Sequence, residues 1–270
     1  MRSHLGQGDN HVGQVDGRVA VVTGSTGGIG LAIAQGLFAE GASIVLNGRN
    51  PEKGERVLAE MGADKRRIFV QADVSQREGV EHLISSAAEH FGSVDILVNN
   101  AGGATVLLPT VDMTDEAWDE VMKWNVYSTF WATRAALKLM IPQQWGRIIN
   151  ISSVEGKHGK PVVTAYVAAK HAINGMTKSV AKEVGTLGIT VNSLCPGLVL
   201  TDIVKSSGPA TAAAMGLSFE GMVDLFAQES AIKRPNTVDE VAAVAVLLCS
   251  EVASGITGAL WSVDGGTAAY

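Results

Sequence analysis

The chain has 270 residues, of which 46% are hydrophobic and 18% charged, and its formal net charge is −6. This composition excludes an intrinsically disordered chain, because apolar residues are abundant and the net charge is small. The acidic balance, without a long Lys/Arg run, argues against nucleic acid or an anionic membrane surface as the main partner. The longest apolar run, Val241–Cys249, has nine residues, about half of the ~18–20 that a membrane span needs. We therefore expect a soluble globular protein.

The first residues of the chain are polar and glycine-rich and lack the apolar stretch of a secretory signal. We expect residues 1–15 to form a flexible tail and residues 16–270 to form one folded domain. Only two cysteines are present, Cys195 and Cys249, too few for a disulfide framework and without the spacing of metal ligands. This usage favours a reducing, cytoplasmic compartment and predicts no metal site.

From Arg18 onward, short β-branched runs alternate with longer segments of helical period. The short runs are apolar throughout, which is typical of strands covered on both faces. Seven strands interleaved with helices predict a single-domain α/β fold: a doubly wound (Rossmann-type), seven-stranded parallel sheet with helices on both faces. The predicted strands are Val19–Val22, Ser43–Leu46, Ile68–Val70, Ile96–Val98, Ile148–Ile151, Ile189–Leu194 and Ala259–Val263.

A glycine-rich turn, Thr23-Gly-Ser-Thr-Gly-Gly-Ile-Gly30, follows the first predicted strand, and a helical pattern begins inside it. Glycines allow the backbone to approach a pyrophosphate closely, and the free amides at a helix start supply positive potential for it. We expect this turn to bind a dinucleotide, an ordinary tight turn being the alternative. The expected contacts come from Gly24, Ser25, Thr26, Gly28, Ile29 and Gly30.

The end of the second predicted strand bears on the choice of nucleotide. An NAD-preferring site usually carries an acidic residue there for the adenosine ribose, but this chain has Arg49 and no carboxylate. An arginine can pair with a 2′-phosphate, so we favour NADP(H) as the cofactor, with NAD(H) possible. The alternative for Arg49 is a solvated loop residue without a role in binding. After the third predicted strand, Asp73 and Val74 are candidates for the adenine, although Asp73 can equally cap the following helix near Ser75.

Tyr166 and Lys170 lie four residues apart in a segment, Thr164–Ala181, that reads as helical. Four residues make about one turn, so both side chains share one face. An ammonium group beside a phenol is expected to lower the phenol pKa, which makes Tyr166 a candidate acid–base group. Ser152 and Ser153 follow the predicted strand Ile148–Ile151, at the end where sites form in parallel sheets. A helix cap or turn is the alternative for both serines.

Residues ~18–266 resemble the short-chain dehydrogenase/reductase family, including its 3-oxoacyl carrier-protein reductases and aromatic polyketide ketoreductases. The matching motifs keep their order and separations, with Ser153 thirteen residues and Asn125 forty-one residues before Tyr166. The motifs are Thr23-Gly-x-x-x-Gly-x-Gly30, Asn99-Asn100-Ala101-Gly102, Asn125, Ser153, Tyr166-x-x-x-Lys170 and Pro196-Gly197.

The resemblance implies a role for each matching residue. Tyr166 exchanges the proton with the substrate oxygen, and Ser153 binds that oxygen. Lys170 holds the nicotinamide ribose and lowers the pKa of Tyr166, while Asn125 holds a water that relays protons to Lys170. The cofactor contacts implied by the family are Asn100, Ala101, Gly102, Tyr166, Lys170, Pro196, Gly197, Val199 and Thr201.

The resemblance also suggests that residues 16–270 form a dinucleotide-binding catalytic domain, that residues 201–235 form a substrate lid, and that the protein is a homotetramer. Within the lid, Met215, Phe219, Met222 and Phe226 have the spacing of one helical stripe. This stripe can line an apolar substrate pocket, and core packing or a subunit contact explains it equally well.

The substrate is narrowed by comparison with 3-hydroxybutyrate dehydrogenases, which parts of the chain also resemble. Their carboxylate is bound by Gln, His and Lys, whereas the corresponding positions here are Ala104, Glu155 and Val163. Glu155 would repel an acid, which argues against hydroxybutyrate as the substrate. A basic loop of Lys157, His158 and Lys160 is either solvated or able to attract an acyl-carrier arm.

We therefore expect an oxidoreductase that transfers a hydride between NADP(H) and a ketone/secondary alcohol pair. A small-molecule 3-oxoacyl thioester or polyketide-like ketone is the favoured substrate. The first alternative is an NAD(P)-dependent dehydrogenase of another hydrophobic, cyclic or sugar-derived secondary alcohol. The second is a non-catalytic dinucleotide-binding regulator, which has no need of the acid–base set Ser153, Tyr166 and Lys170.

Overall fold

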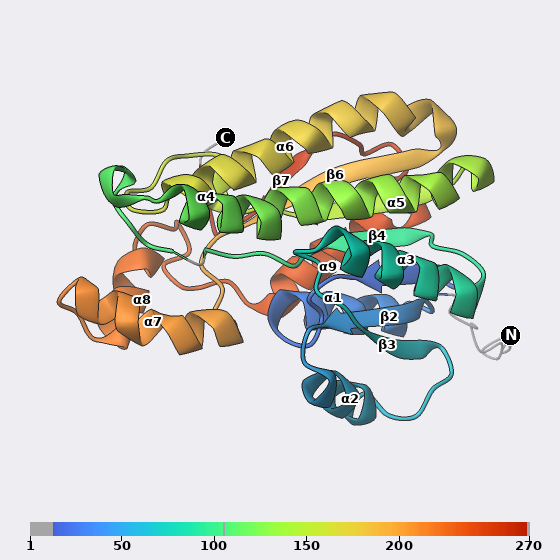
Figure 1. Ribbon diagram of the computed structural model, residues 1–270, viewed down its shortest axis with the longest axis horizontal. Coiled ribbons are helices and arrows are strands. Elements are labelled where there is room, and N and C mark those ends of the chain that lie inside the picture. The colour runs from blue at the N-terminus through green and yellow to red at the C-terminus, as the bar shows by residue number, and fades with distance from the viewer. Residues whose placement is uncertain (1–12, 105, 269–270) are drawn as a thin grey trace, which may run out of the picture.

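A parallel sheet of seven strands runs through the centre of the computed structural model, which describes residues 13–104 and 106–268 (Figure 1). Its strand order is β3-β2-β1-β4-β5-β6-β7, and every neighbouring pair is parallel. The predicted fold class is confirmed, with boundaries that differ by a few residues. The strands are β1 (Val19–Val22), β2 (Ser43–Gly48), β3 (Arg67–Gln71), β4 (Ile96–Asn99), β5 (Gly146–Ile151), β6 (Ile189–Pro196) and β7 (Leu260–Val263).

Helices cover both faces of the sheet, which explains why the strands are apolar throughout. One core cluster joins the sheet to α1 (Gly28–Ala39), α2 (Pro51–Glu60) and α9 (Val238–Cys249). The other joins the opposite face to α3 (Arg77–Phe91), α5 (Ser128–Gln143) and α6 (Thr164–Val184), which lie together along one side in Figure 1. The strand order reverses between β1 and β4, and ligands of open parallel sheets bind beyond the carboxyl ends of such strands.

A long helix with an irregular middle packs beside α6. It starts as α4 (Asp115–Met122), whose first turn is capped by the Thr114 side chain. It passes through a π-helix, η2 (Lys123–Tyr127), and continues directly into α5. π-helical turns hold one extra residue and often occur at functional sites. The short 3-10 helices are η1 (Thr110–Asp112), η3 (Val154–Gly156), η4 (Gly185–Leu187) and η5 (Glu251–Ala253).

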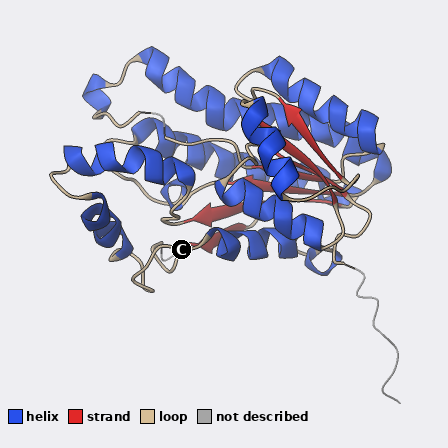
Figure 2. Ribbon diagram, turned by 90° about the horizontal axis from the view of Figure 1, so that it is seen from below, coloured by secondary structure: helices blue, strands red, loops and turns tan. Residues whose placement is uncertain are grey.

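The remaining helices, α7 (Asp202–Ala214) and α8 (Phe219–Ala227), extend away from the sheet (Figure 1), and Figure 2 shows the layered body from a second side. They break the predicted single stripe, because Gly216 takes a left-handed φ of 71° and Ser218 caps a new helix. Met215 therefore ends α7, and the prediction of one continuous stripe is wrong. Phe219 and Met222 pack toward Gly208 of α7, so these two side chains hold the helix pair together.

The N-terminal segment is described only in part. Residues 1–12 of the predicted tail lie outside the described residues. Where description begins, the chain contacts the end of α1: Val15 is buried, and its backbone N–H donates to the Glu40 carbonyl at 3.1 Å. The packed domain therefore includes Val15.

Candidate active site

The glycine-rich turn leaves the start of α1 open. Gly24 and Gly28 have left-handed φ values of 63° and 56°, which favour glycine. Gly27 is the N-cap of α1, and within the described residues no side chain caps this helix. Its first amides are therefore available to an anion, and the helix dipole favours one.

The turn also lies too close to its neighbours for larger residues. A Cβ atom at Gly30 would overlap Asn100 Nδ2, and one at Gly24 would lie 3.1 Å from the Ala101 Cα. Asn100 Nδ2 donates to the carbonyls of Thr23 and Gly24, at 2.9 and 3.1 Å. The predicted contacts from the two motifs are thus brought together, and they form the close backbone cradle that a pyrophosphate requires.

Asn47, at the end of β2, positions this turn, a role that was not predicted from the sequence. Its Oδ1 accepts from Gly24 N at 3.1 Å, and its Nδ2 donates to carbonyls of Val70 and Ala72. The Ser25 hydroxyl accepts from Asn47 N and donates to the Val22 carbonyl. The side chain of Ser25, a predicted cofactor contact, is therefore already hydrogen-bonded within the fold. An asparagine inside a buried strand was the available signal.

The residues predicted to contact the adenosine differ in their exposure and in the hydrogen bonds that their side chains already form. Arg49 is exposed, and no described residue bonds to its guanidinium, whereas Val74 is buried in the core. Asp73 Oδ1 accepts from Ser75 N at 3.0 Å and from Ser75 Oγ at 2.8 Å, which fixes the turn before α3. One carboxylate oxygen of Asp73 therefore caps the turn near Ser75, which is the alternative that the sequence left open for this residue. Thr26 packs against Gly48 beside this region.

Asn125 lies in the π-helix η2 and is completely buried. Its Oδ1 accepts from Gly103 N at 3.1 Å, and its Nδ2 donates to the carbonyls of Gly103 and Val121. A Cβ at Gly102 would lie 2.5 Å from Asn125 Oδ1 and 3.5 Å from Lys170 Nζ. Asn125 therefore holds the loop after β4 against the π-helix η2, and its water-relay role remains a prediction.

The candidate acid–base residues converge at the carboxyl end of β5. Ser153 follows that strand, while Tyr166 and Lys170 face it from α6. Lys170 is 3% exposed, and its Nζ donates to the Ile151 carbonyl at 2.9 Å and lies 5.3 Å from the Tyr166 ring centroid. The three side chains thus form one cluster, next to Gly102.

Burial dominates the acid–base properties of this cluster. It raises the pKa of Tyr166 well above its usual range, and the negative charge of Glu155 raises it further, while a hydrogen bond with Ser153 lowers it. Burial also lowers the pKa of Lys170 to about 8. Lys170 is not among the causes of this shift, so the lowering of the Tyr166 pKa by Lys170 that the family resemblance implies stays a prediction, while desolvation of the phenolate outweighs the hydrogen bond with Ser153. Tyr166 is a neutral phenol, the form that can give a proton.

Glu155, in η3, is the closest partner of Ser153. Its Oε2 accepts from Ser153 Oγ, and its backbone N–H donates to the same Oγ at 3.2 Å. Its Oε1 lies 3.7 Å from Lys160 Nζ, which in turn lies 3.9 Å from the ring centroid of Phe226 in α8. From the sequence we expected Glu155 only to repel acidic substrates, and its hydrogen bond with Ser153 was not predicted.

The segment after β6 brings α7 to the glycine turn. Gly197 N donates to the Val263 carbonyl at 3.1 Å, directly after Pro196 ends the strand. Thr201 Oγ1 caps α7, and its Cγ2 lies 3.3 Å from where a Gly28 Cβ would stand. Val199 is buried, so among these predicted cofactor contacts Thr201 lies closest to the turn.

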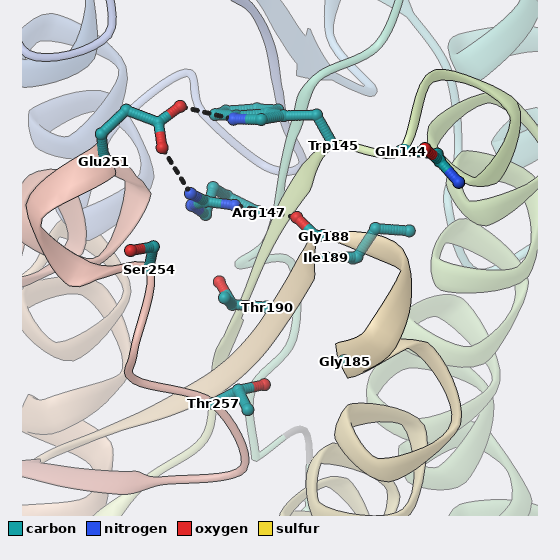
Figure 3. A pocket seen from close by; sticks show the side chains of 10 residues that line it. All are labelled: Gln144, Trp145, Arg147, Gly185, Gly188, Ile189, Thr190, Glu251, Ser254 and Thr257. Atoms are coloured by element: carbon teal, nitrogen blue, oxygen red, sulfur yellow. Dashed lines mark hydrogen bonds and ion pairs between the residues drawn. The ribbon is translucent and has the colours of Figure 1, made fainter.

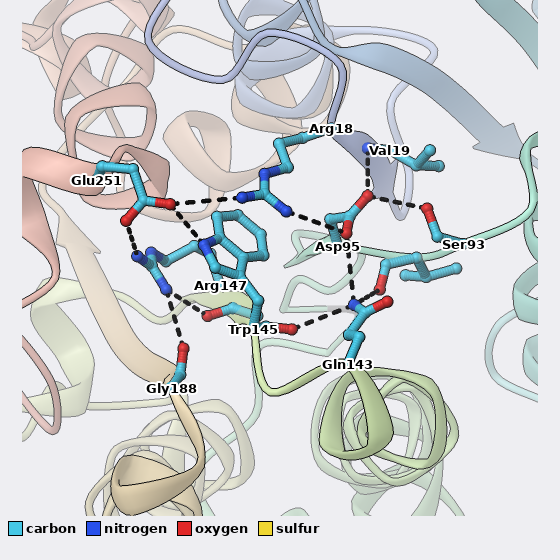
Figure 4. Close-up of polar contacts among 11 residues, drawn as sticks. Arg18, Val19, Ser93, Asp95, Gln143, Trp145, Arg147, Gly188 and Glu251 are labelled. Atoms are coloured by element: carbon cyan, nitrogen blue, oxygen red, sulfur yellow. Dashed lines mark hydrogen bonds and ion pairs between the residues drawn. The ribbon is translucent and has the colours of Figure 1, made fainter.

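A second concave region lies at the opposite, amino end of the sheet. This cavity of about 220 Å³ is lined by residues of the β5 and β6 starts and of the η5 segment (Figure 3). Figure 4 shows the adjoining polar cluster around Arg147, Trp145 and Glu251. None of the predicted site residues lines this cavity. Across residues 13–104 and 106–268, no group of three or more His, Cys, Asp or Glu can hold a metal, and no helix is long and apolar enough to cross a membrane.

Known proteins resemble this chain over most of its length. Residues 18–212 match the family model described as short chain dehydrogenase. The D-beta-hydroxybutyrate dehydrogenase of Cupriavidus necator is 41% identical, over 93% of this chain and 98% of its own. The 3-oxoacyl-(acyl-carrier-protein) reductase of Haemophilus influenzae is 38% identical over 93% and 98%. The crystal structure of a variant of actinorhodin polyketide ketoreductase with NADPH matches with a TM-score of 0.89 and 34% identity, covering 94% of this chain and 98% of that one.

Proposed function

The chain belongs to the short-chain dehydrogenase/reductase family, and we propose that it uses NADPH to reduce a ketone to a secondary alcohol. It is an oxidoreductase whose family acts on hydroxyl and ketone groups with NAD(P). The observation that carries the proposal is the cluster of Ser153, Tyr166 and Lys170 beside Gly102, at the same end of the sheet as the glycine turn.

The cradle observed at the glycine turn fits a dinucleotide. Backbone groups from Gly24 to Gly30 would hold its pyrophosphate, and Asn100, Ala101 and Gly102 would line its path toward Lys170. When bound, the nicotinamide supplies a hydride to the carbonyl carbon. The protein supplies position and electrostatics for that transfer.

The chain's own residues manage the proton. Tyr166, held as a neutral phenol by burial, gives its proton to the carbonyl oxygen. The Ser153 hydroxyl donates a hydrogen bond to that oxygen and stabilises its developing charge. Lys170 presents a buried ammonium toward Gly102, where it would hold the nicotinamide ribose when the cofactor is bound, and Asn125 keeps the intervening loop in place.

The preference for NADPH rests on Arg49. Its side chain is exposed at the carboxyl end of β2, and no described carboxylate pairs with it. A guanidinium in that place can bind a 2′-phosphate in two parallel hydrogen bonds. The NADPH bound in the actinorhodin ketoreductase structure supports the same choice.

For the substrate, a 3-oxoacyl thioester or a polyketide-like ketone is favoured. The named activities of the Haemophilus relative and of the actinorhodin enzyme support this class. The hydroxybutyrate dehydrogenases are slightly more similar in sequence, but Glu155 bonds to Ser153 where an acid substrate would bring a second negative charge. Another hydrophobic, cyclic or sugar-derived secondary alcohol is the remaining alternative.

The test is a panel of ketones assayed with NADPH and NADH in parallel, and with NADP⁺ and the matching alcohols. We expect turnover of uncharged ketones, with a lower KM for NADPH than for NADH. A protein that binds either nucleotide tightly and turns over no ketone or alcohol contradicts the proposal and favours a non-catalytic regulator.

Three further expectations belong to this proposal. Residues 201–235 act as a substrate lid, since Lys160 links Glu155 to Phe226 of α8. The protein is a homotetramer, on the ground of family resemblance, which sedimentation velocity tests. A cytoplasmic location rests on the cysteine usage.

A further inference from the structure

Ser153 is bonded twice to Glu155. The Ser153 Oγ donates to Glu155 Oε2 and accepts from the backbone N–H of Glu155. A serine hydroxyl has one proton, and here that proton points at a carboxylate. The same proton is the one that Ser153 has to donate to the carbonyl oxygen of a substrate in the proposed reaction.

A ketone therefore competes with Glu155 for the Ser153 proton. A charged acceptor forms a stronger hydrogen bond than a neutral carbonyl, so a plain ketone is at a disadvantage. A substrate that offers its own donor to Glu155 Oε2 removes this disadvantage. It replaces the bond that the carboxylate loses and leaves the Ser153 proton for the carbonyl.

The surrounding charges decide what kind of donor fits. The Lys160 ammonium lies 3.7 Å from Oε1 of Glu155, on the oxygen that Ser153 does not use. Lys170 Nζ donates to the Ile151 carbonyl, and Lys157 Nζ donates to Ser262 Oγ, so neither forms an ion pair with Glu155. Lys160 therefore offsets part of the carboxylate charge. A neutral hydroxyl suits Oε2 better than a second ammonium, and an acid is disfavoured.

We propose that Glu155 is a specificity-determining residue that selects ketones with a hydroxyl group one or two carbons from the carbonyl. The spacing follows from the geometry: Ser153 Oγ and Glu155 Oε2 are hydrogen-bonded neighbours, so the two substrate oxygens that replace this bond lie close together. This inference rests on the proposed ketone reduction and narrows its substrate class to hydroxyketones.

The test compares three substrates of similar size, namely 4-hydroxybutan-2-one, pentan-2-one and acetoacetate. Pentan-2-one has a methyl group where 4-hydroxybutan-2-one has its hydroxyl. With the unmodified protein and NADPH, we expect kcat/KM for 4-hydroxybutan-2-one to exceed that for pentan-2-one by about tenfold or more, the scale of one hydrogen bond to a charged group, with acetoacetate the poorest. In Glu155→Leu, we expect this ratio to approach one and kcat/KM for pentan-2-one to rise above that of the unmodified protein, because Ser153 is released.

A merely structural role for Glu155 predicts something else, namely an equal loss on both neutral ketones. Glu155→Gln preserves shape and removes the charge; we expect a reduced hydroxyl preference and improved turnover of acetoacetate. Glu89→Gln, an exposed carboxylate on α3, is the matched control and leaves all ratios unchanged. As a readout without turnover, calorimetry on Tyr166→Phe with NADPH should show 4-hydroxybutan-2-one binding about tenfold more tightly than in the Tyr166→Phe/Glu155→Leu double variant.

The outcomes separate the two proposals. If no ketone is reduced with either nucleotide, the proposed function fails and this inference fails with it. If pentan-2-one is reduced as well as 4-hydroxybutan-2-one by the unmodified protein, only the selection by Glu155 is overturned. An equal loss on both ketones in Glu155→Leu and Glu155→Gln has the same meaning.

Discussion

A buried cation lies at each end of the sheet, and the two cations differ in how many hydrogen bonds they form with the protein. At the amino end, the guanidinium of Arg147 donates to the carbonyls of Gly146 and Gly188 and to Glu251. Trp145 stacks against this guanidinium and donates from Nε1 to the same Glu251, at 2.6 Å (Figure 4). At the carboxyl end, the buried ammonium of Lys170 has one hydrogen bond within the described residues, to a backbone carbonyl.

The difference shows that density of charge does not identify a site. The amino end has a cavity beside a polar cluster in which Arg147, Trp145 and Glu251 are hydrogen-bonded to one another or to backbone carbonyls. The carboxyl end keeps hydrogen-bonding capacity unused, in the first amides of α1 and in two donors of Lys170. Hydrogen-bond donors that lack a protein partner, at the point where the strand order reverses, can bind a ligand.

The largest expected effect concerns the carboxyl end. Replacing Tyr166→Phe removes the proton donor and should lower kcat/KM for ketone reduction by ~10²–10⁴-fold, the usual range for general acid catalysis. Nucleotide affinity, measured by NADPH fluorescence, and the thermal midpoint should remain close to normal. Near-normal turnover in this variant removes Tyr166 from its role.

The comparison predicts the reverse outcome at the amino end. Arg147→Met leaves the carbonyls of Gly146 and Gly188 without this donor and removes one of the donors to Glu251, and should lower the free energy of unfolding by about 3 kcal/mol. Because the Arg147 side chain is 2% exposed and that of Glu251 is 63% exposed, Glu251→Gln should cost less than about 1 kcal/mol. Urea unfolding measures both. In either variant kcat should stay unchanged, and a large fall in kcat with intact stability would connect this end to the chemistry.

The state of Lys170 can be read from the pH dependence of stability. Its folded pKa of about 8 lies below the ordinary value of 10.5, so the unfolded chain binds more protons between these values. The free energy of unfolding should therefore gain up to ~2 kcal/mol from Lys170 as pH rises from about 8 to 10. Lys170→Met should flatten this rise relative to the unmodified protein. Identical slopes for the two proteins mean that the ammonium is not desolvated.

The smallest effect is expected at Arg49, which is exposed. Arg49→Ala should raise the KM for NADPH several-fold and change that for NADH little, as a solvent-exposed charge pair is worth ~1 kcal/mol or less. Lys53→Ala, which removes a half-buried cation that pairs with Asp202 near the glycine turn, is the control. Equal changes for the two nucleotides exclude a 2′-phosphate contact at Arg49.

The fold was predictable because each level of the sequence agrees with it. All seven strands were expected from apolar runs such as Ile148–Ile151, and the sheet is parallel as their continuous burial indicates. The family motifs also gave the positions of Tyr166 and Lys170 on one face of α6. Spacing along a helix is a local property, so it can be read without knowing the rest of the chain.

The contacts that tune the site were not predictable in this way. The bond between Ser153 and Glu155 depends on the turn made by η3, and the burial that raises the pKa of Tyr166 depends on packing from distant segments. The break between α7 and α8 at Gly216 is local, but the pattern of apolar residues continues across it and conceals it.

The π-helix between α4 and α5 makes this stretch of chain intolerant of changes in length. An α-helix turns about 100° per residue, and the π-helix accommodates one extra residue between α4 and α5, so deleting one residue among Lys123–Tyr127 would leave a regular helix with α4 and α5 close to their present orientation. Regular backbone bonding would be restored, yet the Asn125 amide would swing away from Gly103, which it now holds by two hydrogen bonds. Engineering by insertion, deletion or chimeric crossover should therefore avoid this segment, even though a more regular helix would be the result.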